Sequence, residues 1–324
     1  MLSLFAVPFL SALILTACLT KYTIPVLKRM KMGQKILQIG PSWHKDKEGT
    51  PTTGGAVFAS VITVVSAVCV LLLSQNNTPL LLAYVSTLGF AMLNALIGFI
   101  DDMTKIRMRR NEGLTPKQKI LLQLTVSGLY LFALSALGFI STEIYIPFVK
   151  ISVDLGIFYY FLALILILGA TNCANLTDGI DGLAGSVAAV ISFFMLIFAL
   201  NSENALLLTV CSAVCGGTLG FLSYNLHPAK IFMGDTGSLF LGAILTGCAF
   251  LMGSPLIILV FGIAYVIEGA SVIIQVTVYK ICKRRVFKMA PIHHHLEKCG
   301  LSENGIVLIF VVATALFSLL AFLG

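Results

Sequence analysis

The chain has 324 residues, of which 58% are hydrophobic and only 11% are charged, and its mean hydropathy is +0.99. Soluble domains carry about a quarter charged residues, so a soluble protein of this composition would expose large apolar patches and aggregate. The composition excludes a soluble globular protein and predicts an integral membrane protein.

Ten apolar runs are long enough to cross a bilayer, which requires about 20 helical residues. Because the runs are continuous rather than alternating, and because lipid requires an internally satisfied backbone, they predict helices. We expect an all-α polytopic membrane protein that forms one transmembrane domain over residues 1–324. The expected spans are 2–27, 55–73, 79–100, 118–139, 155–171, 180–200, 205–223, 236–253, 255–280 and 305–323.

The net charge of +7 is distributed unevenly between the two sides of this predicted bundle. Of the 21 Lys and Arg residues, all but Lys21 and Lys150 lie in the odd-numbered connections between spans. The positive-inside rule makes those connections cytoplasmic and places both termini outside. Topology and lipid headgroup contact explain most of these charges. Nucleic-acid binding is not expected, because the chain has no basic module with interleaved aromatic residues.

The acids and imidazoles lie on the same side as the basic residues. All five His residues and six of the seven Asp residues fall in or at the edges of the odd-numbered connections; Asp154 is the exception. This distribution is typical of an enzyme that works at the membrane interface. A secondary transporter would instead place ionisable groups near the bilayer midplane, where only Glu268 is expected here.

Lys45 and the Gly49–Gly55 stretch GTPTTGG, which includes Thr50, precede the second span. Pro and Gly fit a turn into the membrane, and Lys45 and backbone N–H groups could contact phosphate. The next cluster, IGFIDDMTK over 97–105, ends the third span with Asp101, Asp102 and Lys105. Adjacent carboxylates after an apolar helix are costly unless they are solvated, paired or metal-bound.

The connection between the fifth and sixth spans is NCANLTDGIDGL, over 172–183. Asp178 and Asp181 are each followed by Gly, which suits a tight turn whose backbone can approach a phosphate or a metal. Oxygen ligands of this kind match Mg²⁺ rather than zinc. A polar turn held by Asx hydrogen bonds would explain any one of these residues, but not the whole set between two spans.

The segment FMGDTGS over 232–238 opens the eighth span, with Asn225 and His227 upstream. Asp235 either caps this helix or takes a metal, and the free N–H groups of such a helix end bind anions. Further on, Glu268, Ser271 and Gln275 follow i, i+3, i+7 spacing and form a polar stripe, which serves either a lipid groove or interhelix hydrogen bonding.

The last predicted cytoplasmic loop contains MAPIHHH over 289–295. Three consecutive His residues cannot face one metal, and no zinc spacing accompanies them. Hydrogen bonding to phosphate or uracil is the functional interpretation, and simple surface exposure is the alternative.

IGFIDDxxK, NLTDGIDGLAG, FMGDTGS and MAPIHHH occur in this order and on one predicted face. Together they resemble the phospho-N-acetylmuramoyl-pentapeptide transferase family, and more broadly the polyprenyl-phosphate N-acetylhexosamine-1-phosphate transferases. The resemblance covers essentially the whole chain. The chain departs from the family pattern at Leu296, where Phe is expected, and at Thr53, where Met is common.

The resemblance implies transfer from UDP-MurNAc-pentapeptide to undecaprenyl phosphate in the bacterial inner (plasma) membrane, giving lipid I and UMP. It implies Mg²⁺ as cofactor, a homodimer and a broken ninth helix beside a lipid groove. Asp101, Asp102 and Asp235 are the implied catalytic residues, with Asp235 as the metal ligand and Asp101 favoured for accepting a proton from the lipid phosphate or orienting it. The implied substrate-binding residues are Lys45, Thr50, Lys105, Lys117, Asn172, Asn175, Asp178, Asp181, Asn225, Phe232, Gly234, Gln275, Ala290, His293, His294 and His295.

Three other functions compete with this interpretation. A related branch would transfer GlcNAc-1-phosphate, and the MAPIHHH run argues against it. A CDP-alcohol phosphotransferase would need a longer motif with an Arg and a second downstream Asp pair, which do not follow Asp181. A lipid flippase would need no one-sided Asp cluster.

Overall fold

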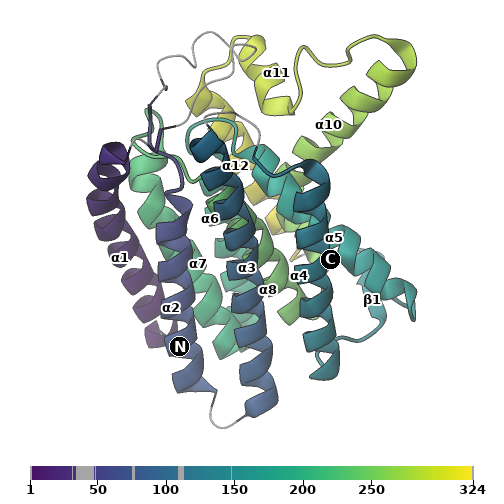
Figure 1. Ribbon diagram of the computed structural model, residues 1–324. Helices are drawn as coiled ribbons and strands as arrows, with labels where there is room; N and C mark the ends of the chain where they lie inside the picture. Colours follow the sequence, from purple (N-terminus) through teal and green to yellow (C-terminus); the bar gives the residue numbers. More distant parts are fainter. Residues whose placement is uncertain are drawn as a thin grey trace.

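A computed structural model describes residues 2–30, 32–33, 47, 49–74, 77–108, 113–146 and 148–322 of the chain. Within these residues, ten helices are long and apolar enough to span a membrane, and they form one bundle (Figure 1). The ten spans confirm the predicted all-α polytopic class. They are α1 (Leu2–Arg29), α2 (Gly55–Leu73), α3 (Thr78–Met108), α4 (Pro116–Ala136), α5 (Phe158–Thr177), α6 (Leu183–Asn201), α7 (Ala205–Asn225), α8 (Gly234–Leu251), α10 (Ile263–Cys282) and α12 (Glu303–Leu320).

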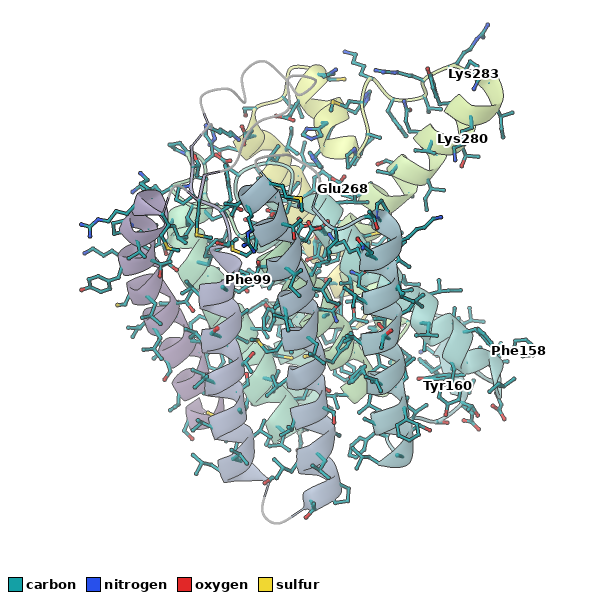
Figure 2. The ribbon with its side chains drawn as sticks, viewed as in Figure 1. Phe99, Phe158, Tyr160, Glu268, Lys280 and Lys283 are labelled. Atoms are coloured by element: carbon teal, nitrogen blue, oxygen red, sulfur yellow. The ribbon has the colours of Figure 1, made fainter. Side chains whose placement is uncertain are left out.

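The run expected as one span over 255–280 is divided in the structure. A five-residue helix, α9 (Ile257–Phe261), is separated from α10 by Gly262, a residue with poor helix propensity. α10 then leaves the bundle (Figure 1), and Lys280 and Lys283 lie at its outer end (Figure 2). The short helix α11 (Ile292–Lys298) follows it. The division agrees with the broken helix that the resemblance implied.

The helix α11 was not predicted, and neither was a strand pair elsewhere in the chain. The connection between α4 and α5 forms a two-stranded antiparallel hairpin of β1 (Glu143–Ile146) and β2 (Ile151–Asp154), with Glu143 opposite Asp154. Thr142 donates a hydrogen bond to the exposed Asp154 at 2.6 Å. Strands of four residues are shorter than the mean strand length, so an apolar connection of this size carries little strand signal.

The centre of the bundle is formed by α7 and α8, which are buried along most of their length, whereas α1, α10 and α12 are mostly exposed. The exposed faces carry large aliphatic residues, which suits contact with lipid, where hydrophobicity does not distinguish inside from outside. Close helix contacts instead use small residues. A Cβ on Gly216 would overlap the carbonyl of Phe9 in α1, so glycine lets these two backbones approach.

A glycine likewise allows α3 to pack closely against the start of α8. A Cβ on Gly98 would overlap the carbonyl group of Asp235. Because the neighbouring atoms belong to the backbone, the helices themselves would have to separate.

We expect Gly98→Ala to lower both the yield of monodisperse protein and the activity of what remains, because the two helices carry the residues described below. Gly89→Ala is the matched control, since Gly89 lies in the same helix with no atom within 4 Å of an added Cβ. Ala is favoured over Gly in a helix by about 1 kcal/mol, so the control is expected to be neutral or stabilising. Size-exclusion profiles and thermal unfolding in detergent compare the two, and equal behaviour would contradict the packing argument.

Candidate functional site

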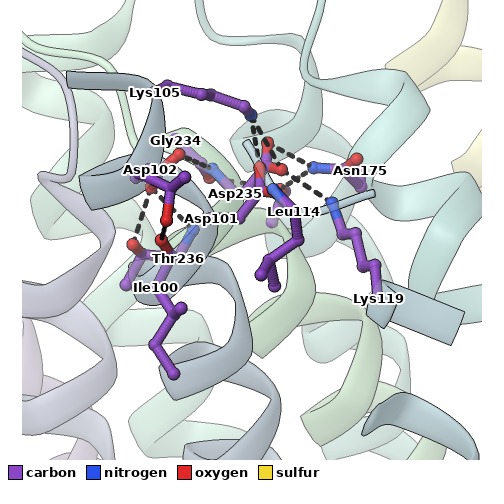
Figure 3. A network of polar contacts seen from close by, with 12 residues as sticks. Ile100, Asp101, Asp102, Lys105, Leu114, Lys119, Asn175, Gly234, Asp235 and Thr236 are labelled. Atoms are coloured by element: carbon purple, nitrogen blue, oxygen red, sulfur yellow. Dashed lines mark hydrogen bonds and ion pairs between the residues drawn. The ribbon is translucent and has the colours of Figure 1, made fainter. Parts of the chain in front are cut away.

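Three carboxylates from distant parts of the sequence meet at one end of the bundle. Asp101 and Asp102 lie near the C-terminal end of α3, and Asp235 lies in the first turn of α8. One oxygen atom from each lies within 4.8 Å of the others, as Figure 3 shows. The structure therefore brings together the three residues that the resemblance implied to be catalytic.

Two lysines compensate most of this negative charge. Lys105 Nζ lies 2.6 Å from Asp101 Oδ2 and 3.0 Å from Asp235 Oδ2. Lys119 Nζ donates to the same Oδ2 atom of Asp235 at 2.7 Å. Lys117 is exposed and has no polar partner among the described residues. The structure thus places Lys119, rather than the predicted Lys117, beside the acids.

Asp102 has a different environment from its neighbour. Its Oδ1 atom accepts a hydrogen bond from the Asp235 N–H at 3.1 Å, and its Oδ2 atom accepts from the Thr236 N–H and hydroxyl at 3.1 and 2.7 Å. The first N–H groups of a helix lack intrahelical partners, and negative charge is stabilising there. Asp102 therefore caps α8 from α3 and fixes the backbone of Asp235.

Replacing Asp102 with Ala is expected to destabilise the fold, because it leaves buried donors of α8 without acceptors. Such orphaned groups cost about 1–3 kcal/mol each, so the apparent unfolding temperature should fall by roughly 5–10 °C. The control is Asp154→Ala on the exposed hairpin, which should lower the apparent unfolding temperature by much less. Similar shifts for the two variants would show that the capping contacts contribute little.

The turn between α5 and α6 also reaches the acids. Asn175 Nδ2 donates to Asp235 Oδ1 at 3.0 Å and to Ser238 Oγ at 2.8 Å. Asp178 ends α5, and its carboxylate has no hydrogen-bond partner among the described residues. Desolvation, and then the nearby carboxylates of Asp235 and Asp102, raise the pKa of Asp178 well above its usual range. A bound hydrogen-bond donor or cation would stabilise this group, so it is available to a ligand.

Asn172 lies one turn before Asn175 and has a structural contact. Its Nδ2 atom donates to Gln123 Oε1 of α4 at 2.9 Å. Asn172 therefore holds α5 to α4, and the structure does not bring it to the acids.

Asp181 belongs to a separate network of ion pairs. Its Oδ1 atom lies 2.7 Å from Lys47 Nζ, and its Oδ2 atom lies 3.0 Å from His227 Nδ1 and accepts from the Ala229 N–H at 3.0 Å. Glu303, at the start of α12, lies 2.6 Å from Lys47 Nζ and accepts from the Asp181 N–H at 3.0 Å. Asp181, His227 and Glu303 have the spacing of metal ligands, but the Lys47 ammonium already pairs with two of them. The network ties α12 to the turn after α5.

The first His of the HHH run is directed toward the same turn. His293 is fully buried, and its Nδ1 atom lies 3.0 Å from Glu268 Oε1 of α10. A Cβ on Gly179 would overlap His293 Nε2, so glycine lets the imidazole lie directly over the turn. Gly179 is the residue after Asp178, which brings His293 to the edge of the site.

The other two His residues have different partners. His294 Nδ1 lies 2.6 Å from Glu297 Oε2 within α11, and His295 Nδ1 accepts from the Lys288 N–H at 3.1 Å. The run therefore does not act as three equivalent groups.

The polar stripe of α10 forms contacts within the protein. Ser271 Oγ donates to the Glu268 carbonyl at 2.7 Å. Gln275 Oε1 accepts from the backbone N–H groups of Val286 and Phe287 at 3.1 and 2.9 Å. These bonds lie within α10 or run to the segment that follows it, so they are not the interhelix hydrogen bonds that were one of the two predicted uses of this stripe.

Several other predicted binding residues support loops near the acids. Asn225 Nδ2 donates to the Ile231 carbonyl at 2.9 Å, and the Phe232 N–H donates to the Pro51 carbonyl at 2.8 Å. Gly234 is the first residue of α8.

The remaining predicted residues flank the site. The Thr50 N–H donates to the Lys47 carbonyl at 3.1 Å. Ala290 is partly buried just before α11. Lys45 lies outside the described residues.

The acid cluster fits a hard divalent cation. Asp101, Asp102 and Asp235 face the ammonium groups of Lys105 and Lys119, which leaves one carboxylate charge uncompensated. Carboxylate oxygens are the protein ligands that Mg²⁺ prefers, and the group contains none of the His or Cys ligands of a typical zinc site. Asp235 and Asp101 face the two lysines, whereas Asp102 faces the backbone of α8, so Asp235 and Asp101 are the residues that would hold the ion.

Residues 84–253, which run from α3 through α8 and include the three acids, match the model of glycosyl transferase family 4. The phospho-N-acetylmuramoyl-pentapeptide-transferase of Clostridium perfringens (strain SM101 / Type A) is 42% identical over 311 residues, which cover 95% of this chain and 93% of that protein. The chain belongs to the phospho-N-acetylmuramoyl-pentapeptide transferase family. A second relative of the same name, from Halalkalibacterium halodurans, is 42% identical over 310 residues, 95% of this chain and 93% of its own. The resemblance drawn from the motifs is confirmed.

Membership of this transferase family and the ten spans together identify a multi-pass bacterial membrane protein. The polar residues of the site and its neighbouring network that were not predicted from the motifs include Lys47, Lys119, Thr236 and Glu303. Helical spacing carried a signal for Lys119, because it lies four residues before Gln123, which is buried in α4. No comparable local pattern points to Glu303, whose hydrogen-bond partners Lys47 and Asp181 lie more than 100 residues away.

Proposed function

We propose that this protein transfers phospho-MurNAc-pentapeptide from UDP-MurNAc-pentapeptide to undecaprenyl phosphate, forming lipid I and UMP with Mg²⁺ as cofactor. The active site faces the cytoplasm, and residues 1–324 act as one catalytic domain. The observation that carries the proposal is the cluster of three carboxylates and two lysines at one end of a ten-span bundle, in a chain 42% identical to a named transferase.

The chemistry requires such a cluster, because a phosphate must approach a pyrophosphate and both are negatively charged. Preorganised cations and donors that offset charge in the transition state are the main source of catalysis in phosphoryl transfer. When bound by Asp235 and Asp101, Mg²⁺ supplies positive charge at the pyrophosphate. Lys105 and Lys119 supply the rest from fixed positions on α3 and α4. Asp101 is the group we favour for accepting the proton of the lipid phosphate or orienting that phosphate.

The turn between α5 and α6 is proposed to bind the nucleotide end of the donor. Asp178 has no partner among the described residues and a raised pKa, so hydrogen-bond donors of the nucleotide would stabilise it. Asn175 connects this turn to Asp235. Asp181 shapes the turn through Lys47 and Glu303.

The lipid acceptor must reach the site from the bilayer. The outer half of α10 exposes Ile273, Val276 and Ile281, and Lys280 and Lys283 lie at its outer end (Figure 2). Apolar residues followed by basic ones suit a helix at the boundary between acyl chains and anionic headgroups. This arrangement supports delivery of the lipid phosphate along α10.

We favour direct attack of the lipid phosphate over an aspartyl-phosphate intermediate, because Lys105 and Lys119, with a cation that Asp235 and Asp101 would hold, would offset the repulsion between the two phosphates without one. Trapping a labelled phospho-aspartate at a rate equal to turnover would exclude direct attack. The resemblance also leads us to propose a homodimer, which light scattering of the detergent-solubilised protein tests.

The function is tested by incubating purified protein with UDP-MurNAc-pentapeptide, undecaprenyl phosphate and Mg²⁺, and measuring UMP. UMP release that requires the lipid and stops with EDTA is the expected result. Release with UDP-GlcNAc but not with the muramoyl donor would assign the chain to the GlcNAc-1-phosphate branch. No release with either donor from a monodisperse, folded sample would contradict the proposal.

A further inference from the structure

Glu268 and His293 form the one fully buried carboxylate–imidazole pair among the described residues. Each side chain is 0% exposed, and His293 Nδ1 lies 3.0 Å from Glu268 Oε1. No polar atom of either side chain has a hydrogen bond to any described residue, the other member of the pair included, so the pair is a 3.0 Å contact without hydrogen-bond geometry. Removing a carboxylate from water is costly unless it is paired. Among the described residues, His293 is the one side chain at ion-pair distance from Glu268.

The pair joins helix α10 to helix α11. Glu268 lies on α10 at the base of its projecting part (Figure 2), and His293 lies in the first turn of α11. Seven residues further along α10, Gln275 accepts the backbone N–H groups of Val286 and Phe287. The two contacts hold the segment that returns from α10 to α11 at both ends.

The side of the imidazole away from Glu268 faces the site. A Cβ on Gly179 would meet Nε2 first, then Cε1, then Cδ2 of His293. The ring edge carrying Nε2 therefore lies against the backbone after Asp178. Nε2 is fully buried, so it lies against the turn itself and supports the backbone of that turn from below the site.

We infer that Glu268 is the positioning residue of His293 in the proposed transfer reaction. A carboxylate beside one ring nitrogen of a His favours the proton on that nitrogen and fixes the ring orientation. Here the proton is placed on Nδ1, and Nε2 is presented to the turn that binds the donor. Glu268 does not itself touch the substrate, and its effect is exerted through His293. The inference rests on the proposed function only for its kinetic test.

The kinetic test is a double-mutant cycle on UMP release with Glu268→Gln and His293→Gln. Partners that orient a functional group typically contribute 10–100-fold, so Glu268→Gln should lower kcat by about that factor. In the His293→Gln background the same change should cost less than about threefold, because residues acting as one unit are not additive. Equal losses in both backgrounds would overturn the inference.

The matched control is Glu143→Gln, which alters an exposed carboxylate on the hairpin. Its effect should be the same with and without His293→Gln, because it does not act through that ring. If Glu268→Gln does not give folded protein, Glu268→Asp, which keeps the charge on a shorter side chain, replaces it in the cycle.

A spectroscopic test does not depend on turnover. The chain has five His residues, so ¹⁵N-His labelling gives a spectrum in which the His293→Gln variant assigns the His293 signals. The wild type should show the proton on Nδ1, and Glu268→Gln should shift it toward Nε2 while the other His signals stay unchanged. An unchanged His293 signal would overturn the inference. Failure of the wild type to release UMP would instead reject the proposed function and leave this test standing.

Discussion

Replacing Asp235 with Asn is expected to lower the rate of UMP release by about a thousandfold, at the upper end of single-residue electrostatic contributions to catalysis. Asn keeps the size of the side chain and one of its oxygens, so the fold should survive. The variant loses the charge shared by Lys105 and Lys119 through one oxygen atom, and with it the proposed metal ligand.

The rate should be measured at saturating lipid and donor, so that the loss is assigned to kcat. Added Mg²⁺ is expected to restore little, because the remaining acids are paired with lysine or with α8. Asp154→Asn is the matched control, since Asp154 lies on the exposed hairpin. A loss of less than about tenfold for Asp235→Asn would show that this carboxylate is not at the reacting centre.

The second large effect is expected at Lys119. Lys119→Met keeps the apolar stem and removes the ammonium group that lies 2.7 Å from Asp235. We expect a decrease of about a hundredfold in kcat/KM, because one of the two fixed cations facing the pyrophosphate is lost.

Lys117→Met provides a control two residues away on the same helix. Lys117 is exposed, so this variant should keep activity within about threefold of the wild type, as for most surface substitutions. If kcat/KM decreases equally in the two variants, or decreases more in Lys117→Met, the assignment of Lys119 to the site is wrong.

The amino-acid sequence was sufficient to predict the spans, because bilayer thickness sets a length and lipid removes every alternative to a helix. The acid motifs were also readable, since Asp101, Asp102 and Asp235 each follow or open an apolar run. The point at which the ninth span divides into α9 and α10 could not be predicted from the sequence. Gly262 is one glycine among many apolar residues, and only the packing around it decides where the helix ends.

The roles of individual polar residues depended on contacts between distant segments. Asp102 and Asp101 are adjacent, yet one caps α8 and the other pairs with Lys105. Nothing in the local sequence distinguishes them. Lys119 could have been ranked above Lys117 by extending the buried face of α4 back from Gln123, because residues four apart share a helix face.

The site has one part fixed by the contacts between α3 and α8 and another part carried by α10 and α11. The close contact at Gly98 and the hydrogen bond from the Asp235 N–H to Asp102 fix the backbone of Asp235 to α3, so the three carboxylates cannot shift relative to one another without breaking helix packing. The His run is instead held to α10, where Glu268 contacts His293 and Gln275 binds the preceding segment at Val286. Any adjustment to a bulky lipid or peptide must therefore come from the α10 and α11 side. Inhibitors whose binding is least affected by mutations should therefore contact the residues of α3 and α8. Selectivity between related enzymes should instead arise from contacts with α10 and α11.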